Sequence, residues 1–313
     1  MVRIVYVNGA YVPYDQAVVH VEDRGFQFAD AVYEVCEVSG GCLVDERLHM
    51  ERLRRSLGEL RIGLTMSMRA LSAILREIVR RNRVRDGFVY LQVSRGVAPR
   101  DFVFPSPAVA PSVVCYAKAR PGAKFERRAA RGIRVITMPD IRWRRPDIKS
   151  VSLLPNALAR QAAFEAGAEE AWLVDDNGFV TEGAASNAWI LTEGDTLVTR
   201  PAEMAILRGV TRTTLLQALS RVGLTVAERL FSVAEVRRAK EAFVTAATST
   251  VMPVVAVDGM EIGDGRPGPV TLKLRQLFQA SAEKSASNVL LAQTKGRVCN
   301  EVDAKVNDDA LEY

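Results

Sequence analysis

The stretch RRPDIKSVSLLPNALARQ, residues 144–161, places one amine, Lys149, between an acidic residue and the start of a helical pattern. Apolar residues recur there with helical spacing and Gly167 follows, which predicts a helix over about 154–166. Arginines precede the lysine, and nearby positive charges favour the neutral amine that attacks a carbonyl carbon. A lysine beside a helix start is more often a solvated surface charge, so this motif needs companions.

Two further motifs supply companions. In VTEGAASNAWI, residues 180–190, Glu182 precedes small residues that let the backbone approach a flat ligand, and its carboxylate can pair with a protonated ring nitrogen. In AILRGVTRTTLLQAL, residues 205–219, Gly209 precedes a helix predicted over about 211–222, whose free N–H groups can hold a phosphate. Each motif is weak alone. Together they provide the lysine, carboxylate and phosphate-binding helix start that a pyridoxal phosphate site requires.

The rest of the chain predicts a two-domain protein. A length of 313 residues with 48% hydrophobic side chains can bury two cores. Asn8-Gly9 and Gly40-Gly41 mark hairpin turns, and helices are expected at about 45–60 and 67–82, which predicts an α+β first domain with helices on one side of antiparallel strands. Asn177-Gly178 marks a third hairpin, between the strand EEAWLVDD and a single strand GFVTEGAASNAWILTEG.

The expected domain limits follow from composition. The charged stretch KARPGAKFERRAARG, residues 118–132, separates the strands before and after it, so we place the first domain at 1–120 and the second at 121–280. Residues 281–313 are expected to form a polar extension, mobile or loosely attached, because they contain few large apolar side chains.

Several function classes are disfavoured by composition. The net charge of +5 is too small to indicate a nucleic-acid surface. Four cysteines without a CxxC pair, and two histidines, predict no metal site. No phosphate loop, nucleophile elbow or dinucleotide turn is present. An apolar run long enough for a membrane span or a signal peptide is also missing, so we expect no membrane association and a cytoplasmic protein.

Motifs in a fixed order over about residues 3–280 carry a resemblance to a known family. They are EDRGFQFADAVYEV, HMERL, LQVSRGVAPR, DIRWRRPDIKSVSLL, EAGAEEAWL, VTEGAASN, ILRGVTR and MPVVAVDG. The sequence resembles the fold-type IV pyridoxal phosphate enzymes, a two-domain α+β and α/β architecture, and within them the D-amino acid aminotransferases.

The resemblance implies roles for individual residues toward pyridoxal 5'-phosphate. Lys149 matches the lysine that forms the Schiff base and moves the proton at the substrate α-carbon, and Glu182 matches the partner of the ring nitrogen. Matches for the remaining cofactor contacts are Arg52, Val210 and Thr211 at the phosphate, Leu207 against the ring, and Ser186 and Asn187 in the adjoining loop. Relatives commonly have a phosphate-binding threonine where this chain has Ala247, so its backbone N–H or Thr248 is expected to replace that hydroxyl.

For the substrate, Tyr33 and Arg100 match the residues that hold the carboxylate, the arginine coming from the partner subunit of a homodimer. Relatives place a histidine two residues after that arginine, where this chain has Phe102, which makes the pocket more apolar. The implied reaction is reversible transamination between D-amino acids and 2-oxo acids, of the type D-alanine plus 2-oxoglutarate giving pyruvate plus D-glutamate.

Other functions stay open. Because of Phe102, a branched-chain L-amino acid or (R)-amine aminotransferase, or an aminodeoxychorismate lyase, of the same fold remains possible. A non-catalytic cofactor-binding protein and a nucleic-acid-binding module are the alternatives from other classes. The presence of both Lys149 and Glu182 argues against the first, and the small net charge argues against the second.

Overall fold

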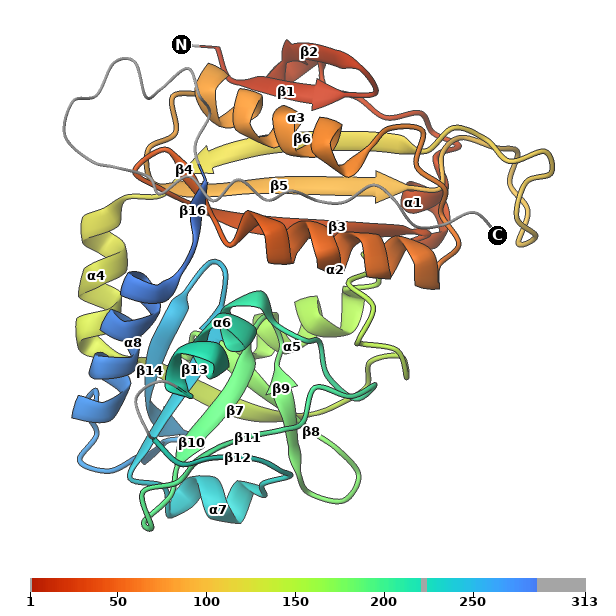
Figure 1. The fold of residues 1–313 in the computed structure, drawn as a ribbon. Helices are drawn as coiled ribbons and strands as arrows, with labels where there is room; N and C mark the ends of the chain where they lie inside the picture. Colours follow the sequence, from red (N-terminus) through yellow and green to blue (C-terminus); the bar gives the residue numbers. More distant parts are fainter. Residues whose placement is uncertain (1, 221–223, 286–313) are drawn as a thin grey trace.

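The computed structural model describes residues 2–220 and 224–285, which form two β-sheets flanked by helices (Figure 1). The helices are α1 (Arg24–Phe28), α2 (Glu46–Glu59), α3 (Met68–Arg81), α4 (Gly122–Arg131), α5 (Leu154–Glu165), α6 (Val210–Leu219), α7 (Val233–Arg237) and α8 (Pro269–Ser281), with a 3-10 turn at Tyr14–Gln16. The four helices expected from sequence therefore form close to their predicted limits, except that residues 221–222 of the last one lie outside the described part.

The first sheet is antiparallel throughout. In sheet order its strands are β16 (Lys284–Ser285), β4 (Cys42–Val44), β3 (Ala31–Ser39), β5 (Gly87–Ser94), β6 (Ser112–Ala119), β1 (Ile4–Val7) and β2 (Ala10–Pro13). Asn8 and Gly9 join β1 to β2 with φ of 44° and 98°, and Gly40 and Gly41 join β3 to β4 with φ of 61° and 86°. Two successive positive φ angles match the twist of a two-residue hairpin, so both predicted turns are confirmed.

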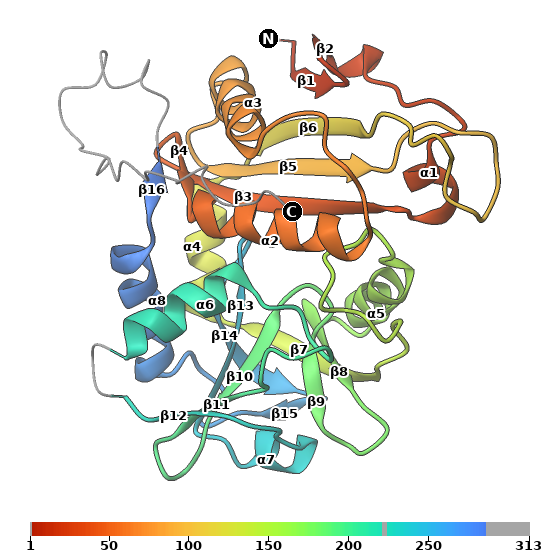
Figure 2. The ribbon, with the colours of Figure 1, turned by 45° about the vertical axis from the view of Figure 1, so that its right-hand side comes forward.

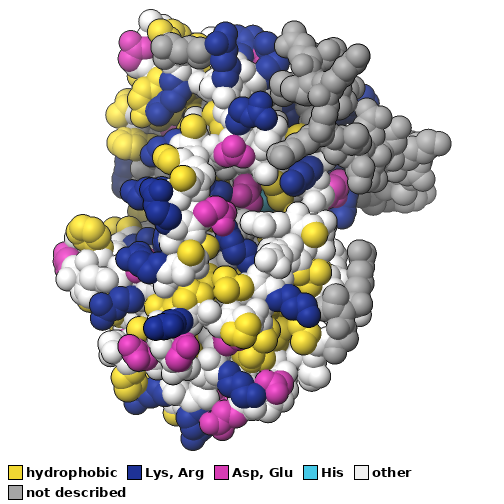
Figure 3. Space-filling model, turned by 90° about the vertical axis from the view of Figure 1, so that its left-hand side faces the viewer, with side chains coloured by type: hydrophobic (Ala, Val, Ile, Leu, Met, Phe, Trp, Pro, Cys, Tyr) yellow, Lys and Arg dark blue, Asp and Glu magenta, His cyan; other side chains and the backbone are white. Residues whose placement is uncertain are grey.

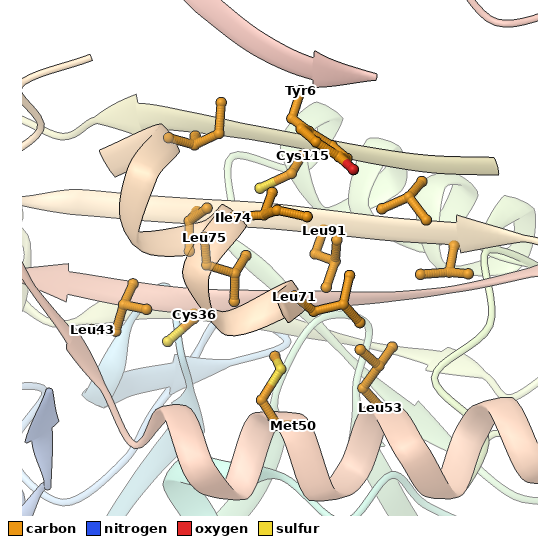
Figure 4. Packing of buried hydrophobic residues seen from close by; sticks show 14 of the residues in the cluster. Tyr6, Cys36, Leu43, Met50, Leu53, Leu71, Ile74, Leu75, Leu91 and Cys115 are labelled. Carbon is orange, nitrogen blue, oxygen red and sulfur yellow. The ribbon is translucent and has the colours of Figure 1, made fainter. Parts of the chain in front are cut away.

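Helices α2 and α3 cover one face of this sheet (Figure 1). Helix α3 begins after Ser67, whose hydroxyl accepts from Ala70 N at 3.2 Å. Apolar residues then recur every three or four positions, and Leu71 and Leu75 are buried against the sheet, as is Leu53 from α2 (Figure 4). Each fully buried leucine contributes roughly 1.5–3 kcal/mol of hydrophobic free energy. The α+β arrangement predicted for residues 1–120 is confirmed. We call these residues the first half and the later residues, which contain the second sheet, the second half.

The second sheet mixes parallel and antiparallel pairs. In sheet order its strands are β12 (Val226–Glu228), β11 (Leu197–Thr199), β10 (Asn187–Leu191), β13 (Glu241–Ala246), β14 (Thr250–Val257), β7 (Ile133–Pro139), β8 (Glu170–Val174) and β9 (Val180–Gly183), with β15 (Met260–Glu261) beside β14. The predicted single strand over GFVTEGAASNAWILTEG is wrong. The chain turns after Gly183, whose N–H donates to Ser186 O at 2.6 Å, so β9 and β10 become separate strands.

The boundary expected near residue 120 falls between β6 of the first sheet and α4, which precedes the second sheet. The division into domains 1–120 and 121–280 stays a prediction. The extension proposed from residue 281 is not loose at its start, because β16 pairs with β4 and so returns the chain to the first sheet. Residues 286–313, the rest of that extension, lie outside the described residues.

Asp45 links the two halves of the molecule close to the point where β16 pairs with β4. Its carboxylate accepts from Thr214 Oγ1 on α6 and from Glu283 N just before β16, each at 2.9 Å. The side chain is buried. Burial raises the pKa of Asp45, while these two donors act in the opposite direction.

None of the helices in residues 2–220 and 224–285 has the length and apolar content that crossing a lipid bilayer requires.

Replacement of Asp45 should therefore loosen the contact between the halves. Asp195 is the matched control because it shares the left-handed backbone, with φ of 58° against 53°, while its ion pair with Lys240 is exposed. Asp45→Ala should lower the free energy of unfolding by roughly 1–3 kcal/mol more than Asp195→Ala, since the Glu283 N–H is left unpaired. Chemical denaturation measures both. Equal losses would show that Asp45 contributes only its backbone conformation.

Candidate active site

A cavity of about 240 Å³ lies where the two halves meet. Its walls come from β3 and α2 of the first half, and from the segment before α5, the ends of β9 and β13 and the start of α6 in the second. In both ribbon views α2 lies on the side of the first sheet that faces the second half (Figure 2). Eleven of the thirteen residues predicted from sequence line it: Tyr33, Arg52, Lys149, Glu182, Ser186, Asn187, Leu207, Val210, Thr211, Ala247 and Thr248.

Lys149 lies on a segment that hydrogen bonds to the first half hold in place. Its N–H donates to Ser56 Oγ of α2 at 3.3 Å, and its carbonyl accepts from Tyr33 N of β3 at 3.0 Å. The amine Nζ lies 4.2 Å from the centre of the Tyr33 ring. The lysine is thus fixed through its backbone, while its amine points toward the cavity residue expected to contact substrate.

Glu182 is the buried carboxylate of the cavity. Its Oε2 accepts from Asn187 Nδ2 at 2.8 Å, and Leu207 N lies 3.1 and 3.2 Å from its two oxygens. Arg142 Nη1 forms an ion pair with Oε1. Burial raises the pKa of Glu182, while Arg142 and the Leu207 N–H act in the opposite direction. A carboxylate so placed suits a cationic ring atom.

Arg52 brings a cation whose side chain is 11% exposed to the other half of the site. Its Nε and Nη2 donate to the two oxygens of Glu34 at 2.8 and 2.7 Å, and its Nη1 donates to Arg208 O at 3.2 Å. His49 Nδ1 lies 2.7 Å from Glu34 Oε2. Burial favours a high pKa for Glu34, but Arg52 and His49 outweigh it and lower the pKa to about 2. Because Glu34 is ionised and only accepts, His49 Nδ1 carries the proton in this contact.

The first turn of α6 offers backbone donors beside Arg52. The helix begins after Gly209, and no side chain caps it, so its first N–H groups are open to an anion. Val210 and Thr211 of this turn line the cavity. Gly209 must be a glycine because a Cβ there would overlap Asn187 Oδ1. The turn with Ala247 and Thr248 also lines the cavity, and their part in binding a phosphate stays a prediction.

Arg100 and Phe102 do not line this cavity. Phe102 is 79% exposed, and the Arg100 guanidinium lies 5.0 Å from the ring centre of Phe28 on the surface of the first half. The sequence interpretation assigned Arg100 to the site of a second subunit, and that assignment stays a prediction.

The sequence interpretation, in which arginines near Lys149 act on its amine as free positive charges, is wrong for Arg142 and Arg145. Arg142 pairs with Asp140 and Glu182, and Arg145 pairs with Asp147 and Glu59. Carboxylates therefore neutralise these two arginines, which do not act as bare charges on the lysine.

Sequence reasoning missed Glu34, His49 and Asp140 as part of the site. One signal was available for Glu34. The alternation of β3 places Glu34 on the same face as Val32 and Cys36, and a charge on a buried face requires a partner.

Comparison with known proteins agrees with this geometry. The model of the amino-transferase class IV family matches residues 31–257. The chain belongs to the class IV aminotransferases. It is 40% identical over 277 residues to a D-alanine aminotransferase of Bacillus licheniformis, covering 88% of this chain and 96% of that one. It is 37% identical over 286 residues to the D-alanine aminotransferase of Staphylococcus haemolyticus, covering 90% and 99%.

Solved structures extend the comparison to the fold. A branched-chain amino acid aminotransferase of Escherichia coli superposes with a TM-score of 0.82 at 24% identity, over 90% of this chain and 94% of that one. A second branched-chain amino acid aminotransferase, solved with pyridoxamine 5'-phosphate, gives 0.81 at 25% identity, over 89% and 93%. The fold-type IV architecture predicted from sequence is confirmed.

The cavity fits the cofactor of this family. Class IV aminotransferases use pyridoxal phosphate, which needs an amine, a partner for a protonated ring nitrogen and an anion site. Lys149, Glu182 and the uncapped start of α6 beside Arg52 offer groups of these three kinds, and all line one cavity. The chain is a pyridoxal phosphate-dependent aminotransferase.

Among the described residues, no group of three or more His, Cys, Asp or Glu side chains is arranged to hold a metal ion.

The contacts of Glu34 with Arg52 and His49 should make the free energy of unfolding depend on pH. The folded pKa of about 2 lies below the ordinary 4.5, so Glu34 stabilises the fold above pH 4.5 and this stabilisation is lost as the pH falls toward 2. The loss amounts to roughly 3 kcal/mol. The difference in unfolding free energy between the wild type and Glu34→Gln, measured over this pH range, should shrink as the pH falls.

Glu37, on the same strand, is the contrasting control. Burial raises the pKa of Glu37 above its usual range despite its ion pair with Arg120. The contribution of Glu37 to stability therefore declines as the pH rises from the ordinary value through its folded pKa. A pH dependence of Glu34→Gln that follows the sign of Glu37→Gln would contradict the Glu34 account.

Proposed function

We propose that this aminotransferase transfers amino groups between D-amino acids and 2-oxo acids, of the type D-alanine plus 2-oxoglutarate giving pyruvate plus D-glutamate. The observation that carries the proposal is the likeness to D-alanine aminotransferases, at 40 and 37% identity over nearly their whole length. The cavity supports it, because Tyr33 lies beside Lys149 at the position matched to substrate binding.

The proposed roles of the residues follow from their contacts. Bound pyridoxal phosphate supplies an electron sink that makes the α-proton of the amino acid acidic. Lys149, held by its backbone, would bond to the cofactor, and its amine would move the α-proton. Arg52 and the first N–H groups of α6 would bind the phosphate, and Leu207 would pack against the ring. Glu182 holds the ring nitrogen, while Ser186 and Asn187 shape the loop, Asn187 by its hydrogen bond to Glu182.

The charges of the cavity indicate that one chain lacks a cation for the substrate carboxylate. Among the described residues, the Lys and Arg side chains that line the cavity are Arg52, Arg142 and Lys149. Arg52 pairs with Glu34 and is assigned to the phosphate, Arg142 pairs with Asp140 and Glu182, and Lys149 is assigned to the bond with the cofactor. None of these three is left for the carboxylate of an amino acid, although a carboxylate favours an arginine fork. We therefore infer a homodimer in which Arg100 of a second copy reaches the site, with Phe102 beside it as an apolar wall.

The fold admits a second function, transamination of branched-chain L-amino acids, because solved structures with that printed activity superpose closely. The higher identity to D-alanine aminotransferases favours the D-amino acid reaction. A nucleic-acid partner is not proposed, since basic side chains are interspersed with acidic and apolar ones on the face shown in Figure 3. We propose a cytoplasmic location, the default for an enzyme of small metabolites.

The stereochemical preference can be tested by absorbance spectroscopy of the holoenzyme. D-alanine or D-glutamate should bleach the visible band of the lysine-bound cofactor, and a 2-oxo acid should restore it, while L-alanine and L-leucine leave the band unchanged. The bleaching reports the first half-reaction of a ping-pong cycle, which needs one substrate only. Lys149→Ala is the control, because it removes the amine and should abolish both the band and turnover.

Bleaching by L-leucine alone would replace the proposal by the branched-chain reaction. Full activity in Lys149→Ala would contradict the assignment of the lysine itself.

A further inference from the structure

Behind Glu182 lies a row of charges that the transamination roles above do not use. Arg142 donates to Asp140 through Nε at 2.9 Å and Nη2 at 2.7 Å, and its Nη1 pairs with Glu182 Oε1. The side chains of Arg142 and Glu182 are each 6% exposed. Thr181 Oγ1 donates to Asp140 Oδ2 at 2.7 Å, which fixes the far end of the row.

We propose that Asp140 and Arg142 are positioning residues that set the proton affinity of the cofactor ring nitrogen through Glu182. This rests on the proposed role of Glu182 as partner of that nitrogen. The row carries one negative, one positive and one negative charge, so its net charge is −1. One protonated ring nitrogen balances that charge, and a buried site favours a balanced set.

Arg142 has a definite effect on Glu182. Burial raises the pKa of Glu182, and Arg142 is the largest opposing influence, ahead of the Leu207 N–H and Lys149. The lysine is used in bonding to the cofactor, so its charge is not a constant partner. Without Arg142, the buried carboxyl would favour its neutral form and would no longer hold a proton on the ring.

Asp140 has the complementary effect. Its two contacts direct Arg142 and offset its charge. If Asp140 were neutral, Arg142 and Glu182 would form a balanced pair, and an added positive charge on the ring would have no partner. The ring nitrogen should then lose its proton at lower pH than in the wild type.

The test reconstitutes the enzyme with pyridoxal phosphate carrying ¹⁵N in the ring and follows the nitrogen chemical shift with pH. In Arg142→Met the shift should move to that of the unprotonated nitrogen at neutral pH, and in Asp140→Asn it should titrate at lower pH. Arg142→Lys should restore part of the wild-type behaviour. For Arg142→Met, kcat should fall by roughly 100-fold with little change in KM, because the residue acts on the ring and not on substrate binding.

The control for Asp140→Asn is Asp175→Asn, which breaks a similar pair with Arg200 outside the cavity and should leave the nitrogen shift unchanged. If Arg142→Met does not fold, Asp140→Asn decides. A wild-type nitrogen titration in Asp140→Asn, or in a folded Arg142→Met, overturns the proposal.

Glu182→Gln separates this inference from the proposed function. If Glu182→Gln loses the ring proton while Arg142→Met keeps it, only the inference fails. If Glu182→Gln also keeps the proton, the role of Glu182 fails together with the inference. A wild type that does not react with D-amino acids would refute the proposed substrate and leave the nitrogen result standing.

Discussion

The paired guanidinium of Arg52 is the interaction on which the site depends. A buried arginine is stable only where carboxylates and carbonyls take up its donors, and Glu34 on β3 does so with both oxygens while His49 supports Glu34 from the same helix as Arg52. The remaining donor reaches the Arg208 carbonyl, just before α6. One side chain therefore joins the first half to the second and brings positive charge to the uncapped start of α6.

The other charges of the cavity follow the same rule. Glu182 is paired within the second half by Arg142, Asn187 and the Leu207 N–H. Because these groups already satisfy one another, a single chain is prepared for a cofactor that carries both a phosphate and a basic ring nitrogen. Within the part of the chain that the structure describes, these pairings and the proposed cofactor contacts leave no Lys or Arg of the cavity for the substrate carboxylate, which is why we propose a group from a second copy.

Local chemistry made much of this structure predictable. Asn8-Gly9 and Gly40-Gly41 adopt the positive φ angles that short hairpins require, and the helices follow their apolar periodicity. Lys149, Glu182 and the residues before α6 are each weak signals alone, and they became informative because together they match the parts of a pyridoxal phosphate site. The predicted cofactor contacts and Tyr33 line one cavity, and their roles are proposals.

What sequence reasoning missed depends on contacts between distant segments. In the turn after Gly183, Ser186 Oγ donates to Glu170 Oε2 at 2.9 Å, and the pairing of β16 with β4 joins residues far apart in the chain. Likewise, the arginine run suggested free charge near Lys149, whereas Asp140 and Asp147 neutralise Arg142 and Arg145. Spacing within a motif does not show which carboxylate a folded chain brings to each arginine.

The most direct test of the account compares the dissociation constants of pyridoxal phosphate and of pyridoxal, which lacks the phosphate, for the wild type and Arg52→Gln. If Arg52 is the cation that completes an anion site at α6, the variant should weaken binding of pyridoxal phosphate by roughly 10- to 100-fold and leave pyridoxal binding nearly unchanged. An equal loss for both compounds would mean that Arg52 only supports the fold. No loss for either would contradict the assembly of the site from the two halves.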